Sequence, residues 1–191
     1  MYPLLVFSIL SLGLMVERFL FYRRLSPKLH PWFEALAGLN QVEEFGVHLK
    51  KLKKHPLRTI LEALLKHRDL DRKDLESMAI EESEEQLQFL ESNLKGLSTL
   101  ALLSPLTGLL GTVLGIMKAF HETSSIGQVD AALLAGGIWE AMITTFVGLA
   151  IAIPTWAAYY YFSSRVERQT FFMEYFSSRF IRLLHHKGWI A

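Results

Sequence analysis

The sequence predicts an all-α membrane protein with three transmembrane helices and long helical extensions in water. Three apolar runs are each long enough to cross a bilayer. The segments between and after these runs show helical periodicity and no strand pattern. A composition of 51% hydrophobic and 20% charged residues is too mixed for a protein buried wholly in lipid. We therefore expect a membrane part joined to a water-exposed part.

Composition excludes several functional classes. The formal net charge is +1, and the basic residues are scattered among acidic ones, so we expect no nucleic-acid binding. The chain has no cysteine, and none of its seven histidines falls in an HExxH spacing, so we expect no metal site and no cofactor. The glycines lack the GK[ST] sequence of a P-loop, and no GxSxG motif occurs, so we expect no enzyme.

Residues 1–22 form the first predicted transmembrane helix, with its N-terminus outside. The apolar run Tyr2–Val16 reaches about 20 residues if the Arg18 side chain extends to the lipid headgroups. A cleavable signal peptide is the alternative, but the basic start and the small-residue cleavage site are both missing. Arg23 and Arg24 place the second end of this helix in the cytoplasm by the positive-inside rule.

Residues 23–96 form a predicted cytoplasmic helical region. Pro31 and Pro56 are expected in the first turns of helices, and Gly38 and Asn40 mark a break. The last part of the region carries a narrow apolar stripe with three- and four-residue spacing, which runs into the second span. We therefore expect one helix that enters the bilayer without interruption. The stripe consists of Leu87, Leu90, Leu94 and Leu97.

Residues 97–120 and 138–162 are the second and third predicted transmembrane helices. The second span carries no charge before Lys118, and the third carries only Glu140. A periplasmic loop, residues 121–137, is expected between them, because this segment contains no lysine or arginine.

Residues 163–191 are predicted to continue the third span as a cytoplasmic helix that ends at Gly188, with a bend at Pro154. The combined helix is more than twice as long as a membrane is thick, so its aromatic side chains need partners in water. We favour packing on the middle-region helices of the same chain over a groove for another protein. These aromatic residues are Phe171, Phe172, Tyr175, Phe176 and Phe180.

Small residues follow one face of the second span and predict close helix packing. Gly108, Gly111 and Gly115 have three- and four-residue spacing, and the last two form a GxxxG pair. Pro105 is expected to bend this span near its cytoplasmic end. Gly148 is the matching small residue on the third span.

Glu140 is the main candidate for a functional residue. An ionisable group in an apolar span is costly and is therefore a functional hypothesis by default. On a helical wheel, Thr144, Thr145 and Gly148 lie within roughly 140° of arc together with Glu140. Thr112 on the second span adds a hydroxyl that can both donate and accept, as a proton path requires.

The alternatives to these site interpretations are structural. Glu140 lies next to Trp139, so it could be an interfacial carboxylate. Threonines in membrane helices often bond only to their own helix, and each threonine alone is better explained that way. Only their joint placement with Glu140 favours a function.

Three stretches resemble the ExbB/TolQ/MotA family of bacterial stator proton-channel subunits, and most closely its ExbB branch. They are PLLVFSILSLGLMVERFLFYRR, SPLTGLLGTVLGIMKAF and GGIWEAMITTFVGLAIAIP. The resemblance implies that Thr112 is the threonine of the GTV motif, Glu140 the glutamate of the GIxEA motif, and Thr145 the threonine five residues later. In the family these residues line or border a central pore.

The resemblance also implies an assembly. The protomers would form a homopentamer in the bacterial inner membrane, around the single spans of an ExbD-like dimer that supplies the protonatable aspartate. Proton flow would then drive a TonB-like protein and outer-membrane transport. A TolQ-like role in the Tol-Pal system is the alternative within the family. A non-conducting scaffold and a secondary transporter are the alternatives outside it, and the missing inverted repeat disfavours the transporter.

Overall fold

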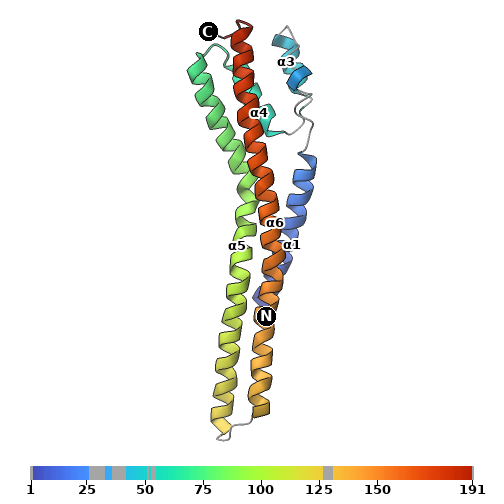
Figure 1. Ribbon diagram of the computed structural model, residues 1–191, viewed down its shortest axis with the longest axis vertical. Coiled ribbons are helices and arrows are strands. Elements are labelled where there is room, and N and C mark those ends of the chain that lie inside the picture. Colours follow the sequence, from blue (N-terminus) through green and yellow to red (C-terminus); the bar gives the residue numbers. More distant parts are fainter. Residues whose placement is uncertain are drawn as a thin grey trace. The chain divides into compact units, whose positions relative to one another are not determined.

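The computed structural model describes residues 2–25, 33–35, 42–50, 52, 55–126 and 131–190. Within these ranges no strand occurs. The long helices α1 (Tyr2–Arg24), α5 (Arg72–Ile126) and α6 (Ala131–His186) are apolar enough to cross a membrane (Figure 1). The shorter helices α3 (Val42–Leu49) and α4 (Pro56–Lys66) lie between α1 and α5 in the sequence. The predicted all-α class with three apolar helices is confirmed.

The chain divides into two compact units. The first unit comprises Met1–Phe19 and Asn93–Phe162, and the second comprises Leu20–Ser92 and Ser163–Ala191. Helices α5 and α6 each contribute to both units. On α6 the boundary falls after Phe162, which is also the last residue of the predicted third span.

Helices α5 and α6 are continuous over 55 and 56 residues, or about 80 Å each. The uninterrupted helix that was expected to lead into the second span is therefore present. Each helix also continues through its internal proline, Pro105 in α5 and Pro154 in α6. The bends expected at these prolines stay predictions.

The predicted loop over residues 121–137 was too long. Helix α5 extends to Ile126, α6 begins at Ala131, and residues 127–130 lie outside the described ranges. At one end, the Ser124 hydroxyl donates to the His121 carbonyl within the helix. At the other end, the segment from Ala131 is rich in alanine and leucine, which have the strongest helix propensity.

The helix ends follow known capping rules. Asp71 caps α5, because its carboxylate accepts a hydrogen bond from the Asp74 amide at 2.8 Å. Gly188 ends α6 with φ +67°, and the amides of Gly188 and Trp189 bond to the carbonyls of His185 and Leu184 in a Schellman motif. The predicted stop at Gly188 is thus confirmed.

Helix α4 begins at Pro56, as predicted, but its capping residue is unusual. The His55 ring nitrogen Nδ1 accepts a hydrogen bond from the Leu57 amide at 3.2 Å. Burial lowers the pKa of His55 to about 4, against a smaller opposing effect of the Gln169 side chain. The predictions for Pro31, Gly38 and Asn40 fall outside the described residues.

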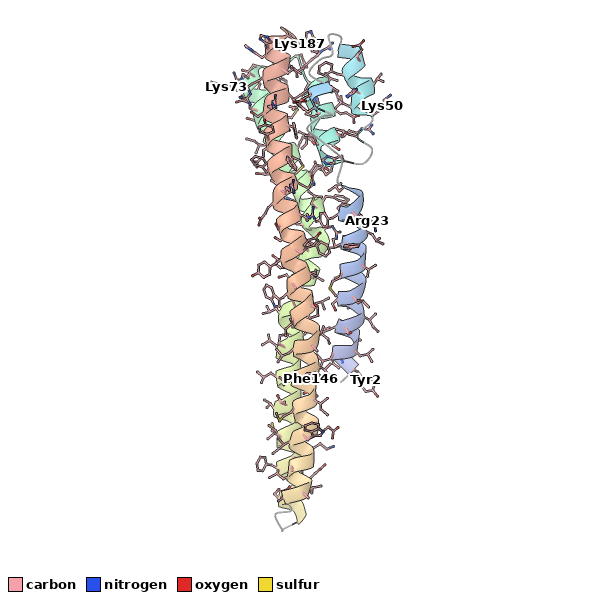
Figure 2. All side chains as sticks on the ribbon, turned by 45° about the vertical axis from the view of Figure 1, so that its right-hand side comes forward. Tyr2, Arg23, Lys50, Lys73, Phe146 and Lys187 are labelled. Carbon is pink, nitrogen blue, oxygen red and sulfur yellow. The ribbon has the colours of Figure 1, made fainter. Side chains whose placement is uncertain are left out.

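In the first unit, α1 packs against α5. The Asn93 side chain donates to the Glu17 carboxylate at 3.1 Å, and Leu14 lies beside Gly96. Arg18 was expected to extend to the headgroups, but it is 4% exposed and bonds to Glu17 at 2.8 Å. An adjacent carboxylate allows the charge to stay inside the protein. Figure 2 shows Tyr2 at the opposite end of α1, 90% exposed.

The core of the second unit is aromatic and aliphatic. Phe176 packs on Phe33 and Phe180 packs on Phe45, with ring centroids 4.8 and 5.9 Å apart. The prediction that the C-terminal aromatics pack on the middle region is therefore confirmed for these two. Phe171 is instead 61% exposed. Leucine and isoleucine side chains of α4 complete the core, namely Leu57, Ile60, Leu61 and Leu64.

Candidate functional site

Three glycines of α5 bring its backbone into direct contact with α6 in the first unit. A Cβ atom added to Gly108 would lie 2.8 Å from the Thr144 carbonyl oxygen. One added to Gly111 would lie 2.5 Å from the Thr144 hydroxyl, and one added to Gly115 would lie 2.6 Å from the Ala141 Cβ. No side chain larger than hydrogen fits these places without displacing α6.

Helix α6 contributes its own glycines to this contact. A Cβ on Gly148 would lie 2.6 Å from the Ser104 carbonyl oxygen and 3.2 Å from the Gly108 Cα. Gly137 extends the contact toward the ends of the two helices, where a Cβ would meet Ala119 at 2.5 Å. Gly137 was not among the predicted packing residues, because it falls in the predicted loop over residues 121–137, whereas α6 begins at Ala131. The GG pair at residues 136–137 is the only sequence signal that pointed to it.

Thr112 and Thr145 meet across this interface. Their hydroxyl oxygens are 3.2 Å apart, and both residues are half-buried. The Thr112 hydroxyl also lies 2.7 Å from the Leu109 carbonyl oxygen, to which it donates. Each hydroxyl has one hydrogen, so Thr145 is the donor and Thr112 the acceptor within the pair. The result is a short chain of hydrogen bonds from the Thr145 hydroxyl on α6 to the Thr112 hydroxyl and on to the Leu109 carbonyl on α5.

Thr144 joins the two helices by a different contact. Its hydroxyl lies 2.7 Å from the Ala141 carbonyl and 3.0 Å from the Gly108 carbonyl on the other helix. The side chain fills the space that Gly111 leaves open. In this protomer the Thr144 hydroxyl therefore faces α5.

Glu140 lies apart from these residues. It occupies the turn of α6 before Thr144, but its side chain is exposed. No hydrogen bond or ion pair joins it to any residue in the described part of the chain. The structure thus brings Thr112, Thr144 and Thr145 together with the glycines and leaves the carboxylate on the surface of the single chain.

Helices α5 and α6 each carry one further hydroxyl residue that is buried. The Ser104 hydroxyl donates to the Leu100 carbonyl and the Thr155 hydroxyl to the Ile151 carbonyl, each at 2.6 Å. Both side chains are fully buried. Because each hydroxyl donates to a carbonyl of its own helix, neither is free to bond to another group. These two residues therefore contribute to the packing only through the small size of their side chains.

The fold and this interface define a multi-pass helical membrane protein whose two long helices share a line of glycines and hydroxyls. The profile of the MotA/TolQ/ExbB proton channel family matches residues 52–175. The chain therefore belongs to this family, which consists of proton channels and not of enzymes. The family resemblance noted in the sequence is confirmed.

Individual relatives come from both the TolQ and the ExbB branches. The Tol-Pal system protein TolQ of Pseudomonas aeruginosa is 41% identical over 110 residues, which are 58% of this chain and 46% of TolQ. The ExbB-like 3 protein of Synechocystis sp. is 33% identical over 80% of this chain and 75% of its own length. The exbB1 protein of Vibrio cholerae is 34% identical, with shares of 80% and 70%. The match to TolQ thus spans less than half of that relative, whereas the ExbB-like 3 and exbB1 matches span 75% and 70% of theirs.

Proposed function

We propose that this chain is an inner-membrane stator subunit that conducts or gates protons together with an ExbD-like single-span partner. A homopentamer would surround a dimer of that partner and couple the proton-motive force, through a TonB-like protein, to outer-membrane transport. Membership of the proton channel family and the long ExbB matches support this proposal.

The observation that carries the proposal is the exposed carboxylate of Glu140 on an apolar helix. A charged group that faces lipid is costly, so Glu140 needs a polar neighbour from outside the protomer. An assembled pore would provide one. Thr145 lies on the same arc of α6 as Glu140, and its hydroxyl meets that of Thr112 on α5, so the pair can accept and pass on a proton. Thr144 would hold the helix spacing at which this pair meets.

The test is Glu140→Gln in the full chain, expressed with its partner subunit in cells that lack the native chain. Glutamine keeps the size and removes the titratable group, so we expect loss of coupled uptake with the native mass of the membrane complex unchanged. Glu122→Gln is the matched control, because Glu122 is an exposed carboxylate on α5 that pairs with Lys118 at 3.7 Å. The control should retain uptake.

Two results would contradict the proposal. Normal uptake by Glu140→Gln would remove the carboxylate from the mechanism and favour a non-conducting scaffold. A wild-type chain that stays monomeric by native mass and ignores an ExbD-like partner would remove the stator assembly itself.

A TolQ-like role is the second candidate function, favoured by the 41% identity to the Pseudomonas protein. Cells that lack this chain would then show an envelope defect while TonB-dependent uptake continues. The reverse pattern supports the ExbB-like role. Both phenotypes can be measured in the same deletion strain.

A further inference from the structure

Charge is segregated between the two long helices in the second unit. Every charged residue of α5 between residues 74 and 91 is acidic. Residues 163–187, which are the end of α6 and the residue after it, carry four arginines and Lys187 but only Glu167 and Glu174 as acids. Such a separation of sign within one protomer provides complementary surfaces for a second copy.

An open groove of about 580 Å³ lies between α5 and α6 within the second unit. Its apolar lining includes Ala79, Ile80 and Ile181, and its charged lining includes Glu84 and Glu174. Ile80 is 60% exposed. Neither Glu84 nor Glu174 forms an ion pair with any residue that the structure describes. We call this feature the acidic groove.

A second surface of α6 has the opposite character. Its residues recur with three- and four-residue spacing and therefore share one helix face, roughly 120° from the groove-lining residues of α6. Phe171 and Tyr175 stack with ring centroids 6.0 Å apart, and the Arg179 guanidinium donates to the Tyr175 hydroxyl at 3.1 Å. We call this surface the arginine stripe, which consists of Arg168, Phe171, Tyr175, Arg179 and Arg182.

The arginine stripe has the composition of a binding surface. Phe171 is 61% and Tyr175 40% exposed, whereas Phe176 and Phe180 on the same helix are buried. Arginine and tyrosine are enriched in protein interfaces, where their flat groups pack and hydrogen-bond at once. Arg168 and Arg182 form no ion pair with other described residues.

We propose that the acidic groove of one copy receives the arginine stripe of the next copy. The two surfaces occupy the same length of α6, residues 170–181 for the groove and 168–182 for the stripe. A neighbour rotated about an axis parallel to α6 therefore aligns them without an axial shift. Because groove and stripe are different surfaces, the contact is head-to-tail and can close into a ring. This inference rests on the proposed oligomer and adds a contact between neighbouring copies outside the membrane-spanning segments.

Disulfide cross-linking tests this contact directly, because the native chain has no cysteine. Two differently tagged full chains are co-expressed, one with Ile80→Cys in the groove and the other with Tyr175→Cys in the stripe. On oxidation of membranes we expect mixed dimers at least about tenfold above those of each variant expressed alone, because a head-to-tail contact pairs unlike surfaces. Glu85→Cys replaces Ile80→Cys in the control, since Glu85 is exposed but does not line the groove.

Charge reversal provides a second measurement that does not depend on disulfide geometry. Glu84→Arg places a like charge opposite the stripe and should weaken self-association about tenfold. Glu85→Arg makes the same change one residue away, outside the groove, and should leave assembly unchanged. Combining Glu84→Arg with Arg168→Glu, the stripe arginine nearest to the level of Glu84 along the helices, should restore most of the loss. Native mass of the purified full chain is the readout for all three.

The outcomes separate this inference from the proposed function. If the wild-type chain assembles but gives neither the mixed dimer nor a loss with Glu84→Arg, the groove and stripe contact is wrong and the stator proposal stands. Equal loss for Glu84→Arg and Glu85→Arg would also overturn the contact, because it would indicate a general charge effect. A wild-type chain that does not assemble would instead contradict the proposed pentamer.

Discussion

The two units pack the same pair of helices in opposite ways. In the first unit, α5 and α6 meet through glycines and hydroxyls, and large side chains such as Phe146, 72% exposed, point outward. In the second unit, large side chains fill the interior, and Phe180 is fully buried. The charges there lie on the outside, as Glu84 and Glu174 illustrate.

The difference is the one expected when the first unit lies in lipid and the second in water, as in the proposed topology. In lipid, an exposed leucine or phenylalanine is already in an apolar medium, so helices associate through close backbone packing and hydrogen bonds. In water, removal of apolar surface is the main driving force, so large residues are buried. A helix that continues from lipid into water should therefore change along its length. It packs through its backbone in lipid and through large buried side chains in water.

The largest effect should come from the aromatic core of the second unit. Phe180→Ala removes a fully buried ring that packs on Phe45, and it should lower the free energy of unfolding by about 3–5 kcal/mol. Phe171→Ala is the matched control, because that ring is exposed and its loss should cost far less. Thermal unfolding of the detergent-solubilised chain measures the loss for both variants. Equal losses would show that burial of large rings is not what stabilises the second unit.

The packing of the C-terminal aromatic residues on the middle region was predictable from the sequence, but which of the rings are buried was not. The aromatic run from Phe171 to Phe180 indicated packing against the middle region, and that packing exists for Phe176 and Phe180. Which rings are buried depends on Phe33 and Phe45, whose positions are set by tertiary contacts and have no signature in the local sequence.

A pH effect of about 3 kcal/mol is expected from His55 in the second unit. Its pKa is about 4 in the folded chain and 6.5 in the unfolded reference. Below pH 6.5 the unfolded chain takes up a proton that the folded chain excludes, so the stability contributed by neutral His55 is lost as the pH falls toward 4. The expected loss is about 1.4 kcal/mol per pH unit.

His55→Asn isolates this effect from the other histidines. Asparagine is a good helix-capping residue and does not titrate, so it keeps the cap and removes the proton equilibrium. The unfolding free energy of the wild type should therefore fall relative to that of the variant between pH 6.5 and 4. A difference that stays constant over this range would show that the pKa of His55 is the same in the folded and the unfolded chain. Histidine is not among the preferred capping residues, so this role had no sequence signal.

In the first unit, Gly148→Val should lower stability by about 1–3 kcal/mol, because the new side chain would overlap the Ser104 carbonyl. Gly136→Val is the control, since a Cβ at Gly136 has nothing within 4 Å. Resistance to unfolding in detergent distinguishes the two. If Gly136→Val were as harmful, the effect would lie in helix propensity and not in the α5–α6 contact.

The sequence predicted the residues of this interface better than their roles. Glycine spacing on one face pointed to close packing, and the helical wheel grouped the threonines with Glu140. The wheel alone cannot separate neighbours on one arc, however. Only the placement of α5 shows that Thr144 faces the Gly111 space while Glu140 stays exposed.

The smallest effect should be the coupling between Thr112 and Thr145. Their hydroxyls are 3.2 Å apart, and hydrogen bonds between membrane helices average about 0.6 kcal/mol in double-mutant cycles. Thr112→Val, Thr145→Val and the double variant should give a coupling energy of this size in detergent unfolding. The same cycle with Thr155→Val should give none, because among the described residues the Thr155 hydroxyl bonds only to the Ile151 carbonyl of its own helix.

This last cycle also separates packing from proton transfer. Valine keeps the shape of threonine closely, so a stability loss of only about 0.6 kcal/mol leaves the fold intact. A large loss of proton-coupled activity with Thr145→Val would then be attributable to the missing donor in the hydroxyl chain and not to altered packing. If activity and stability fell together in proportion, the pair would be a structural link between α5 and α6, and the proton path would have to run past Glu140 alone.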